Sequence, residues 1–448
     1  MRALFLVPVA LTACHDSALV VGGLEEVTRM KAMQNPNLDL LFVIDDSPSM
    51  SDKQVALAAA FPRMIDVLGT IDGGLPNLHI GVVTSDMGTS ASGSVTPGPA
   101  IGQIGSGGCS GRGDDGALQR IPAMSASFLS DVANNGTRDR NYTGELRDVF
   151  GQLARVGAGG CGFEQHLSSM RSALTSPANV GFLRPGANLA IVFLADEDDC
   201  SASNTQLFGP DSSTLGPLQS FRCFQHGVTC DQSPTDIGPK THCVPNATSS
   251  FLDDVEPFVQ ALLATKPDPR MVMVAAIIGD ADPVGVERRT PPGGGTPQPA
   301  LAHSCAFTGV DGPTVADPGI RLAAFLRAFP GRATLTSVCS GDLTNPLGVI
   351  GQSAKQLIGD PCLDTTLLAD ASEEPGIQPS CEVVDIRDSS PDAPTSIAPC
   401  ASGGTDCYDL IADQVACPAS DDHLRVKIRR TVAVADDTWT SVRCQLVE

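Results

Sequence analysis

The stretch LDLLFVIDDSPSM, residues 38–50, decides the fold of this chain. Its first seven residues are almost continuously apolar and match the length of a strand, which is typical of a strand buried on both faces of a parallel sheet. The residues after Ile44 are mostly polar, and the next stretch repeats apolar residues on one helical face at Leu57, Phe61, Met64, Ile65 and Leu68. This order predicts a buried strand, a polar turn and a helix. In that helix we expect Ser51 and Gln54 to form a capping box and Pro62 to kink or divide the chain.

The same alternation of strand and helix repeats along the chain. Further strand-length apolar runs occupy residues 78–84, 189–195, 271–278 and 333–338, and helical patterns separate most of them. The alternation predicts an α/β fold with a doubly wound, mostly parallel sheet of the Rossmann type, whose ligands generally bind at the carboxyl ends of the strands. Stretches rich in Gly, Pro and Ser at residues 87–116, 201–250 and 280–318 are predicted to be loop insertions.

Composition argues against some partners. The 448 residues include 29 Lys and Arg against 51 Asp and Glu, which gives a formal net charge of −22. Nucleic acid is therefore not an expected partner, because its phosphates would be repelled. Aromatic residues make up 4% of the chain, so stacking platforms for bases or sugars are not expected either.

The cysteines divide into two even blocks once Cys14 is set aside. Eight lie between Cys109 and Cys339, and six lie between Cys362 and Cys444. An even count in each block predicts up to seven disulfides in an oxidising compartment, with a boundary near residue 360. Zinc is the alternative for one cluster, but its spacing matches no common finger; this cluster comprises Cys223, His226, Cys230, His242 and Cys243. Residues 361–448 are predicted to form a small disulfide-rich β module.

The first 14 residues, MRALFLVPVALTAC, combine a basic start, a short apolar run and the sequence Leu, Thr, Ala, Cys. This stretch resembles the signal of bacterial lipoproteins. The resemblance implies a signal peptide over residues 1–13, a lipid on Cys14, a tether over residues 14–36 and contact with a membrane through the lipid. Because His15 replaces the Asp that retains such proteins at the inner membrane, the outer membrane is favoured.

The turn after the first strand places Asp45, Ser47 and Ser49 between a buried strand and an amphipathic helix. In this position the pattern DxSxS resembles the metal-ion-dependent adhesion site of von Willebrand factor type A domains, and the resemblance covers residues 37–360. It implies a divalent cation, Mg²⁺ or else Mn²⁺ or Ca²⁺, held by these three residues and by an Asp after a later strand, for which Asp196 fits. Hydroxyl ligands would leave Mg²⁺ net positive and open to an acidic group of a partner.

One position departs from that family. The Gly-rich segment VGAGGCGFEQHL, residues 156–167, puts Cys161 where the family has a Thr ligand. A disulfide sulfur is a poor ligand for Mg²⁺, so Glu164 is the candidate replacement.

The resemblance implies a lipid-anchored envelope protein that binds a protein or surface ligand through this cation, and no enzymatic activity. The motifs GxSxG and HExxH are both absent from the sequence. Two alternatives stay open: a structural, disulfide-rich lipoprotein with a degenerate, metal-free site, and a hydrolase that uses the acidic residues 196–199.

Overall fold

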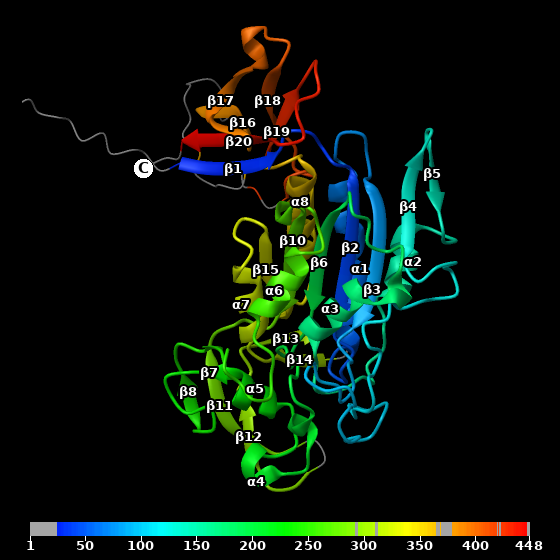
Figure 1. The fold of residues 1–448 in the computed structure, drawn as a ribbon, viewed down its shortest axis with the longest axis vertical. Helices are drawn as coiled ribbons and strands as arrows, with labels where there is room; N and C mark the ends of the chain where they lie inside the picture. Colours follow the sequence, from blue (N-terminus) through cyan, green and yellow to red (C-terminus); the bar gives the residue numbers. More distant parts are fainter. Residues whose placement is uncertain are drawn as a thin grey trace, which may run out of the picture.

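The computed structural model describes residues 25–291, 294–309, 312–363, 368, 379–418, 420 and 423–445. Cys14 and the predicted signal peptide lie outside these residues. The described chain is a mixed α/β structure with a seven-stranded sheet and a separate six-stranded sheet, shown in Figure 1. The mixed α/β class is therefore confirmed.

The seven-stranded sheet has the strand order β15-β10-β6-β2-β3-β4-β5. The pairs from β15 to β3 are parallel, and β4 and β5 add an antiparallel edge. All five predicted strands are present within one residue at each end. The strands are β2 (Asn37–Ile44), β3 (Asn77–Thr84), β4 (Leu129–Asn134), β5 (Thr137–Arg140), β6 (Asn188–Leu194), β10 (Val272–Ile278) and β15 (Ala333–Ser337).

Two apolar cores lie on the two faces of this sheet, because alternate residues of a strand point to opposite sides. In β2, Leu40 and Phe42 join one core, whereas Leu41 and Val43 join the other. The first core is closed by α1 (Ser51–Leu68), α2 (Leu146–Leu153) and α8 (Thr344–Ile358). The second is closed by α3 (His166–Thr175), α6 (Glu256–Leu263) and α7 (Ile320–Arg327).

Helix α1 corrects the predicted capping box and the predicted division of the helix at Pro62. The expected capping box does not form: the residue at the N-cap is Met50, and the Gln54 amide donates instead to the carbonyl oxygens of Asp45, at 3.0 Å, and Gly157, at 2.6 Å. Pro62 does not divide the helix, which continues to Leu68. Gln54 therefore anchors the turn after β2 to the Gly-rich segment rather than capping its own helix.

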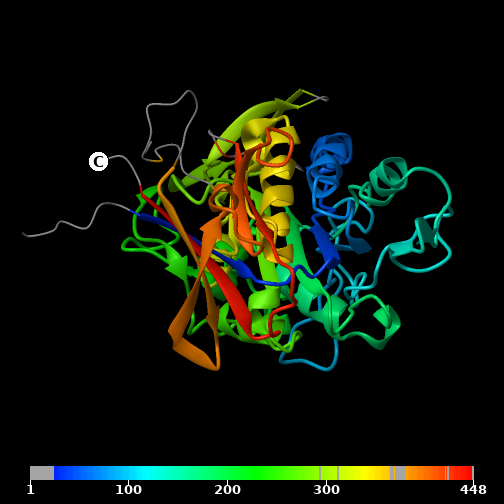
Figure 2. The same cartoon turned by 90° about the horizontal axis from the view of Figure 1, so that it is seen from above.

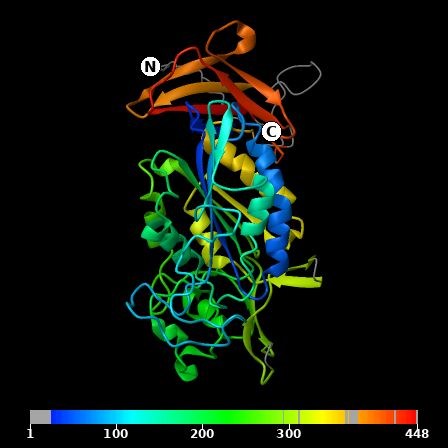
Figure 3. The ribbon, with the colours of Figure 1, turned by 90° about the vertical axis from the view of Figure 1, so that its right-hand side faces the viewer.

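The six-stranded sheet has the order β1-β20-β16-β17-β18-β19 and lies across one end of the seven-stranded sheet (Figures 2 and 3). Strand β1 falls within the predicted tether, residues 14–36, but it pairs antiparallel with β20 and buries Met30 in the core of this sheet. The strands are β1 (Glu25–Lys31), β16 (Cys381–Arg387), β17 (Ser390–Pro399), β18 (Cys407–Ala412), β19 (Leu424–Arg429) and β20 (Thr438–Gln445).

The predicted insertions gather at the opposite end of the molecule and contain short elements of their own (Figure 1). Residues 201–250 hold α4 (Ser212–Leu215), α5 (Phe221–Gly227), β7 (Val228–Thr229), β8 (Gly238–Lys240) and β9 (Val244–Pro245). Residues 280–318 hold β11 (Val284–Arg289), β12 (Gln298–Leu301), β13 (Cys305–Gly309) and β14 (Gly312–Ala316). Short 3₁₀ turns occupy residues 177–179, 205–208, 269–271, 338–340 and 400–402.

Seven disulfides form, as predicted, and each closes within its own block of the sequence. The pairs are Cys109–Cys161, Cys200–Cys223, Cys230–Cys243, Cys305–Cys339, Cys362–Cys417, Cys381–Cys444 and Cys400–Cys407. Because all three cysteines of the alternative zinc cluster are oxidised, the zinc interpretation is wrong. No helix in the described residues is long and apolar enough to span a membrane.

Candidate functional site

The turn after β2 and the loop after β6 meet at the carboxyl edge of the seven-stranded sheet. Strands β2 and β6 are parallel neighbours, and Ile44 lies opposite Leu194 at their ends. The chain therefore leaves both strands at the same edge, and the Ser49 hydroxyl donates to the Asp196 carboxylate at 3.0 Å. In the sheet, β3 lies on one side of β2 and β6 lies on the other. The strand order therefore reverses at β2, and ligands of such sheets generally bind at the carboxyl ends of the strands at this position.

The side chains of the DxSxS turn face one another. One oxygen of Asp45, Oδ1, accepts from the backbone N–H of Ser47 at 2.7 Å, and the hydroxyls of Ser47 and Ser49 lie 3.1 Å apart. The other oxygen, Asp45 Oδ2, is buried and has no hydrogen-bond partner. Burial, followed by the nearby charge of Asp196, raises the pKa of Asp45 to about 7. Ser49 is exposed, so solvent reaches the turn from its side.

A buried lysine also reaches this group of oxygens. The Lys53 ammonium lies 2.9 Å from Asp196 Oδ2, and it donates to the Ser49 carbonyl oxygen at 2.9 Å and the Thr314 hydroxyl at 2.7 Å. Its side chain has no solvent exposure. Burial still raises the pKa of Asp196, and Lys53 is the main group that opposes this rise. The structure thus provides Asp196 with a fixed positive charge that sequence analysis missed.

His166 lies beside the unpartnered oxygen of Asp45 without neutralising it. Its Nε2 is 4.0 Å from Asp45 Oδ2, which is too long for a hydrogen bond, and both ring nitrogens lack partners. Burial lowers the pKa of His166 to about 4, so the ring is neutral at pH 7. Asp45 therefore has no cationic neighbour in hydrogen-bonding contact among the described residues.

The fifth predicted ligand, Glu164, does not join this hydrogen-bonded group. Its side chain is 1% exposed, and its Oε1 has no partner. Burial raises the pKa of Glu164 well above its ordinary value, and the charges of Glu197 and Asp45 add to the effect. Glu164 lines a cavity next to the turn instead. The residue at the family's Thr position, Cys161, is bonded to Cys109, so no thiolate is present there.

The donor set at the turn suits a hard cation. No three His, Cys, Asp or Glu side chains in the described ranges are grouped so that they could hold a metal ion. The turn offers a different set: an unpartnered carboxylate oxygen of Asp45 beside the hydroxyls of Ser47 and Ser49, with Asp196 next to Ser49. Oxygen ligands of this kind, completed by water, are those that Mg²⁺ accepts. Because Asp45 Oδ2 is buried without a partner, the residues of the turn fit a divalent cation.

Comparisons with known proteins find weak structural similarities only. No family model matches the chain, and no curated protein matches it. A von Willebrand factor type A protein from Catenulispora acidiphila aligns over 95% of this chain and 65% of its own length, at 12% identity and a TM-score of 0.30. The pilus adhesin RrgA from Streptococcus pneumoniae aligns over 94% and 58%, at 12% identity and a TM-score of 0.30. The human COPII-coat protein Sec24c aligns over 94% and 46%, at 8% identity and a TM-score of 0.30.

The chain thus spans less than two thirds of each of these neighbours. At these scores the likenesses place neither a site residue nor a ligand on this chain.

Sequence analysis missed two residues of the site, Lys53 and Asp46. Lys53 stands four residues after Ser49, one helical turn into α1, which puts its side chain back over the turn. Asp46, the second residue of DxSxS, is 7% exposed, and burial and then Asp45 raise its pKa to about 8. The spacing could have suggested the role of Lys53, whereas the burial of Asp46 depends on the tertiary fold.

Proposed function

We propose that this chain is an envelope-anchored binding protein that captures an acidic group of a protein or surface ligand through a divalent cation. Asp45, Ser47 and Ser49 would hold the cation, and Asp196 would bind it directly or through water. One observation carries the proposal: Asp45 Oδ2 is buried and unpartnered beside two hydroxyls. A buried carboxylate oxygen without a partner costs free energy, which a bound cation would recover.

The charge of the site supports an acidic ligand. Three carboxyl groups lie at the turn: Asp45, Asp46 and Asp196. Lys53 already neutralises Asp196, and burial raises the pKa of Asp46 to about 8, so that it is mostly uncharged at pH 7. A divalent cation bound mainly by Asp45 and neutral hydroxyls would remain net positive and open on the exposed side of Ser49. A carboxylate of the partner could complete its coordination there. The candidate cations are Mg²⁺, Mn²⁺ and Ca²⁺, and calorimetric titration with each of them distinguishes them.

Membrane attachment forms the second half of the proposal. Cys14 would carry the lipid and hold the protein at the outer membrane, with β1 following after residues 15–24. A Cys14→Ser variant should appear in the soluble fraction, whereas the unaltered protein should partition into detergent. Equal partition of the two proteins would overturn the lipid anchor and leave the metal site untouched.

The metal-free structural role is the second candidate, and Lys53 favours it. Its ammonium already bonds Asp196, and the disulfide Cys109–Cys161 removes one ligand of the adhesion site. In that case Lys53 is the resident cation, and the protein serves as a disulfide-rich envelope component.

Calorimetry separates the two candidates. The Cys14→Ser protein would be titrated with Mg²⁺, Mn²⁺ and Ca²⁺, alongside versions that also carry Asp45→Asn or Asp280→Asn. Asp280 is an exposed carboxylate just after β10 at the same sheet edge, so it controls for loss of one negative charge. Binding that Asp45→Asn abolishes and Asp280→Asn keeps supports the metal site. Identical titrations for all three proteins would leave only the structural role.

The acidic ligand is tested separately. The wild-type protein and Asp45→Asn would be used to capture partners from envelope extracts, with and without a chelator. The proposal predicts a partner that is retained by the wild-type protein, released by the chelator and never bound by Asp45→Asn. A partner that ignores both the chelator and the substitution would contradict capture through a cation.

A further inference from the structure

A cavity of about 410 Å³ lies next to the DxSxS turn, between the sheet edge and the insertions. Five carboxylates line it. Two are glutamates, Glu164 from the Gly-rich segment and Glu197 from the loop after β6; the others are Asp198, Asp199 and Asp317, the last of which is bonded to the His303 ring at 2.7 Å. Three phenylalanines also line it: Phe163, Phe221 and Phe224. The cavity therefore combines acidic and apolar walls in one space.

The two glutamates lack a positive partner. Neither Glu164 nor Glu197 forms an ion pair with a Lys, Arg or His within the described ranges, and the partner of Glu197 is a neutral hydroxyl, that of Ser220. The oxygen Glu164 Oε1 is buried and has no hydrogen-bond partner at all. Glu164 is thus a carboxyl group in the cavity wall that is 1% exposed and has one unpartnered oxygen. Burial raises the pKa of both Glu164 and Glu197 well above the ordinary value, and a bound cation would stabilise their ionised forms.

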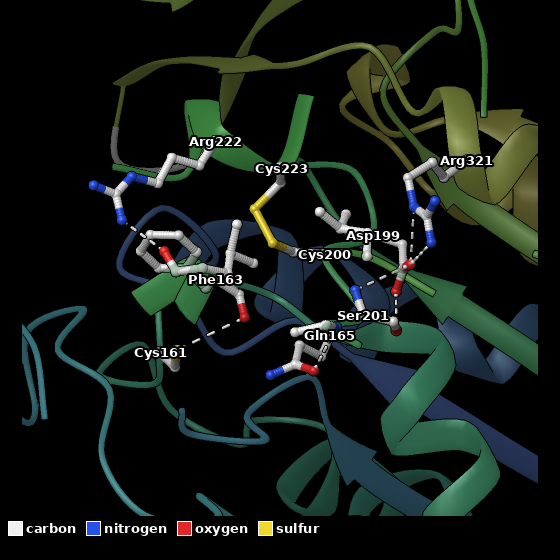
Figure 4. The surroundings of a disulfide bond; sticks show 12 residues. Cys161, Phe163, Gln165, Asp199, Cys200, Ser201, Arg222, Cys223 and Arg321 are labelled. Atoms are coloured by element: carbon white, nitrogen blue, oxygen red, sulfur yellow. Dashed lines mark hydrogen bonds and ion pairs between the residues drawn. A yellow bond between two sulfur atoms is a disulfide. The ribbon is translucent and has the colours of Figure 1, made fainter. Parts of the chain in front are cut away.

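The other charged residues of the wall are already satisfied. Asp198 accepts from the backbone N–H groups of Arg321 and Leu322 at the start of α7. Asp199 is paired with the Arg321 guanidinium at 3.0 Å, as Figure 4 shows. The one basic residue among those lining the cavity is Arg289, and its guanidinium is bonded to Glu287 at 2.9 Å and to the Leu301 carbonyl oxygen at 2.6 Å.

The apolar wall is fixed in place. Helix α5 contributes Phe221 and Phe224, and its Cys223 is joined to Cys200, directly after the acidic loop, by a disulfide (Figure 4). Phe163 packs edge-on against Phe208 with the ring centres 5.5 Å apart. A rigid apolar wall beside unpaired carboxylates favours a ligand that has both a positive group and an apolar stem.

We infer that this cavity binds an organic cation, a primary ammonium or guanidinium group on an alkyl stem, with the charged head at Glu164 and Glu197 and the stem against the phenylalanines. Both a basic side chain of a partner protein and a free polyamine have this chemistry. The cavity is a neighbour of the cation site proposed at Asp45: the charge of Asp45 reaches both glutamates, but none of Asp45, Ser47 and Ser49 lines the cavity.

The test uses small probes in the presence of a chelator, so that its outcome is independent of the metal site. The full chain with Cys14→Ser would be titrated with butylammonium and agmatine, and with butyrate as a probe of similar size and opposite charge. We expect millimolar or tighter binding of both cations and none of butyrate. Binding of butyrate equal to that of butylammonium, or no binding of either cation, would overturn the inference.

Variants locate the site. Glu164→Gln and Glu197→Gln keep the side-chain shape and should each weaken agmatine binding about tenfold, the loss expected for one charged hydrogen bond. Asp280→Asn should leave it unchanged. If Glu164→Gln fails to fold, as judged by circular dichroism, Phe221→Ala provides the second measurement and should weaken butylammonium binding. Unchanged affinity in the folded variants would place the cation elsewhere and contradict the inference.

A further pair of probes identifies the natural source. Spermidine represents free polyamines, and a blocked Gly-Lys-Gly peptide represents a basic side chain of a partner. Preferential binding of either one supports the inference and assigns the source. Binding of neither, despite a folded protein, would contradict it.

Discussion

One buried carboxylate, Asp39, lies near the start of β2, and another, Asp45, lies just after its end. Asp39 has two cationic partners, whereas Asp45 has none in hydrogen-bonding contact among the described residues. Asp39, at the amino end, is fully buried; its carboxylate lies 2.8 Å from the Arg184 guanidinium and 3.2 Å from the Lys266 ammonium. Asp45, at the carboxyl end, is equally buried, but its hydrogen bonds come from Ser47, whose N–H lies 2.7 Å from Oδ1, and its second oxygen has no partner.

A similar contrast separates the buried Asp360 from the two cavity glutamates. Near the six-stranded sheet, the buried Asp360 lies 2.7 Å from the Arg425 guanidinium and 3.7 Å from the Lys355 ammonium. At the other end, Glu164 and Glu197 have no such cation within the described chain. The fold can therefore supply cations where carboxylates are structural. Where it does not, the missing positive charge is what a ligand could provide.

The largest effect expected from this contrast is at Asp39. Replacing Asp39 with Asn would leave the buried Lys266 and Arg184 charges without their shared partner, so we expect a loss of about 3–5 kcal/mol in the free energy of unfolding. Urea unfolding of the Asp39→Asn variant measures this loss. A change within about 1 kcal/mol would mean that Asp39 is no more essential to the fold than an exposed carboxylate, and the comparison would fail.

Lys53 comes next, because its buried ammonium is the positive charge that bonds Asp196 at the carboxyl edge. Replacing Lys53 with Met should destabilise the metal-free protein by about 3 kcal/mol, since Asp196 loses its buried partner. The same change should tighten divalent-cation binding, by about tenfold, because a metal ion no longer competes with the ammonium for Asp196. Calorimetry with Mn²⁺ and urea unfolding measure both effects. Unaltered metal affinity would show that Lys53 and the metal do not share Asp196.

At Asp45 we expect substitution to raise the free energy of unfolding rather than lower it. Replacing Asp45 with Asn removes a buried charge that has no cationic partner, so the metal-free protein should gain about 1–2 kcal/mol at pH 8. Thermal unfolding in the presence of a chelator checks this, with Asp280→Asn as the control of equal charge change. A loss of stability like that expected for Asp39→Asn would show that Asp45 already has an effective partner.

The pH dependence of folding stability tests the same lack of a cationic partner at Asp45, with a smaller expected effect. The folded-state pKa values of Asp45, about 7, and Asp46, about 8, lie above the ordinary value of 3.8. The folded state therefore holds more protons than the unfolded state between about pH 4 and pH 8, and the stability due to these carboxyls falls as the pH rises through that window. The lowered pKa of His166, about 4, has the opposite effect, but only below its ordinary value of 6.5.

The useful comparison is thus between pH 6.5 and pH 8.5, where the contribution of His166 is constant. With a chelator, the melting temperature of the wild-type protein should fall by a few degrees over this range. Saturating Mg²⁺ should reduce the fall, because it stabilises the ionised form of Asp45, and should leave the part that is due to Asp46. A fall of the same size in Asp45→Asn and with Mg²⁺ would attribute the effect to other groups.

The sequence predicted the parts of the fold that depend on local pattern. Strands β2, β3, β6, β10 and β15 follow from their apolar runs, and the meeting of Ser49 with Asp196 follows from parallel strands that end at one edge. Pairings between strands that are distant in the sequence could not be predicted from local pattern. Strand β1 was assigned to a tether because its seven residues gave no clear period, and its partner β20 lies some 400 residues further along the chain.

Within the site, sequence reasoning identified the oxygen donors but not the charge balance. DxSxS and the acidic run after β6 named Asp45, Ser47, Ser49 and Asp196. That Lys53 reaches Asp196, and that Glu164 turns to a cavity, depends on how α1, the Gly-rich segment and the insertions pack. Which carboxylates have partners is a property of the tertiary structure alone.

The central claim is that oxygens of the DxSxS turn and Asp196 hold a divalent ion, and a crystal structure grown with Mn²⁺ tests it most directly. We predict an anomalous difference peak bonded to Asp45, Ser47 and Ser49 at the carboxyl edge, beside Asp196. No peak at the turn, with the Lys53 ammonium still in contact with Asp196 and Asp45 Oδ2 still unpartnered, would contradict the claim.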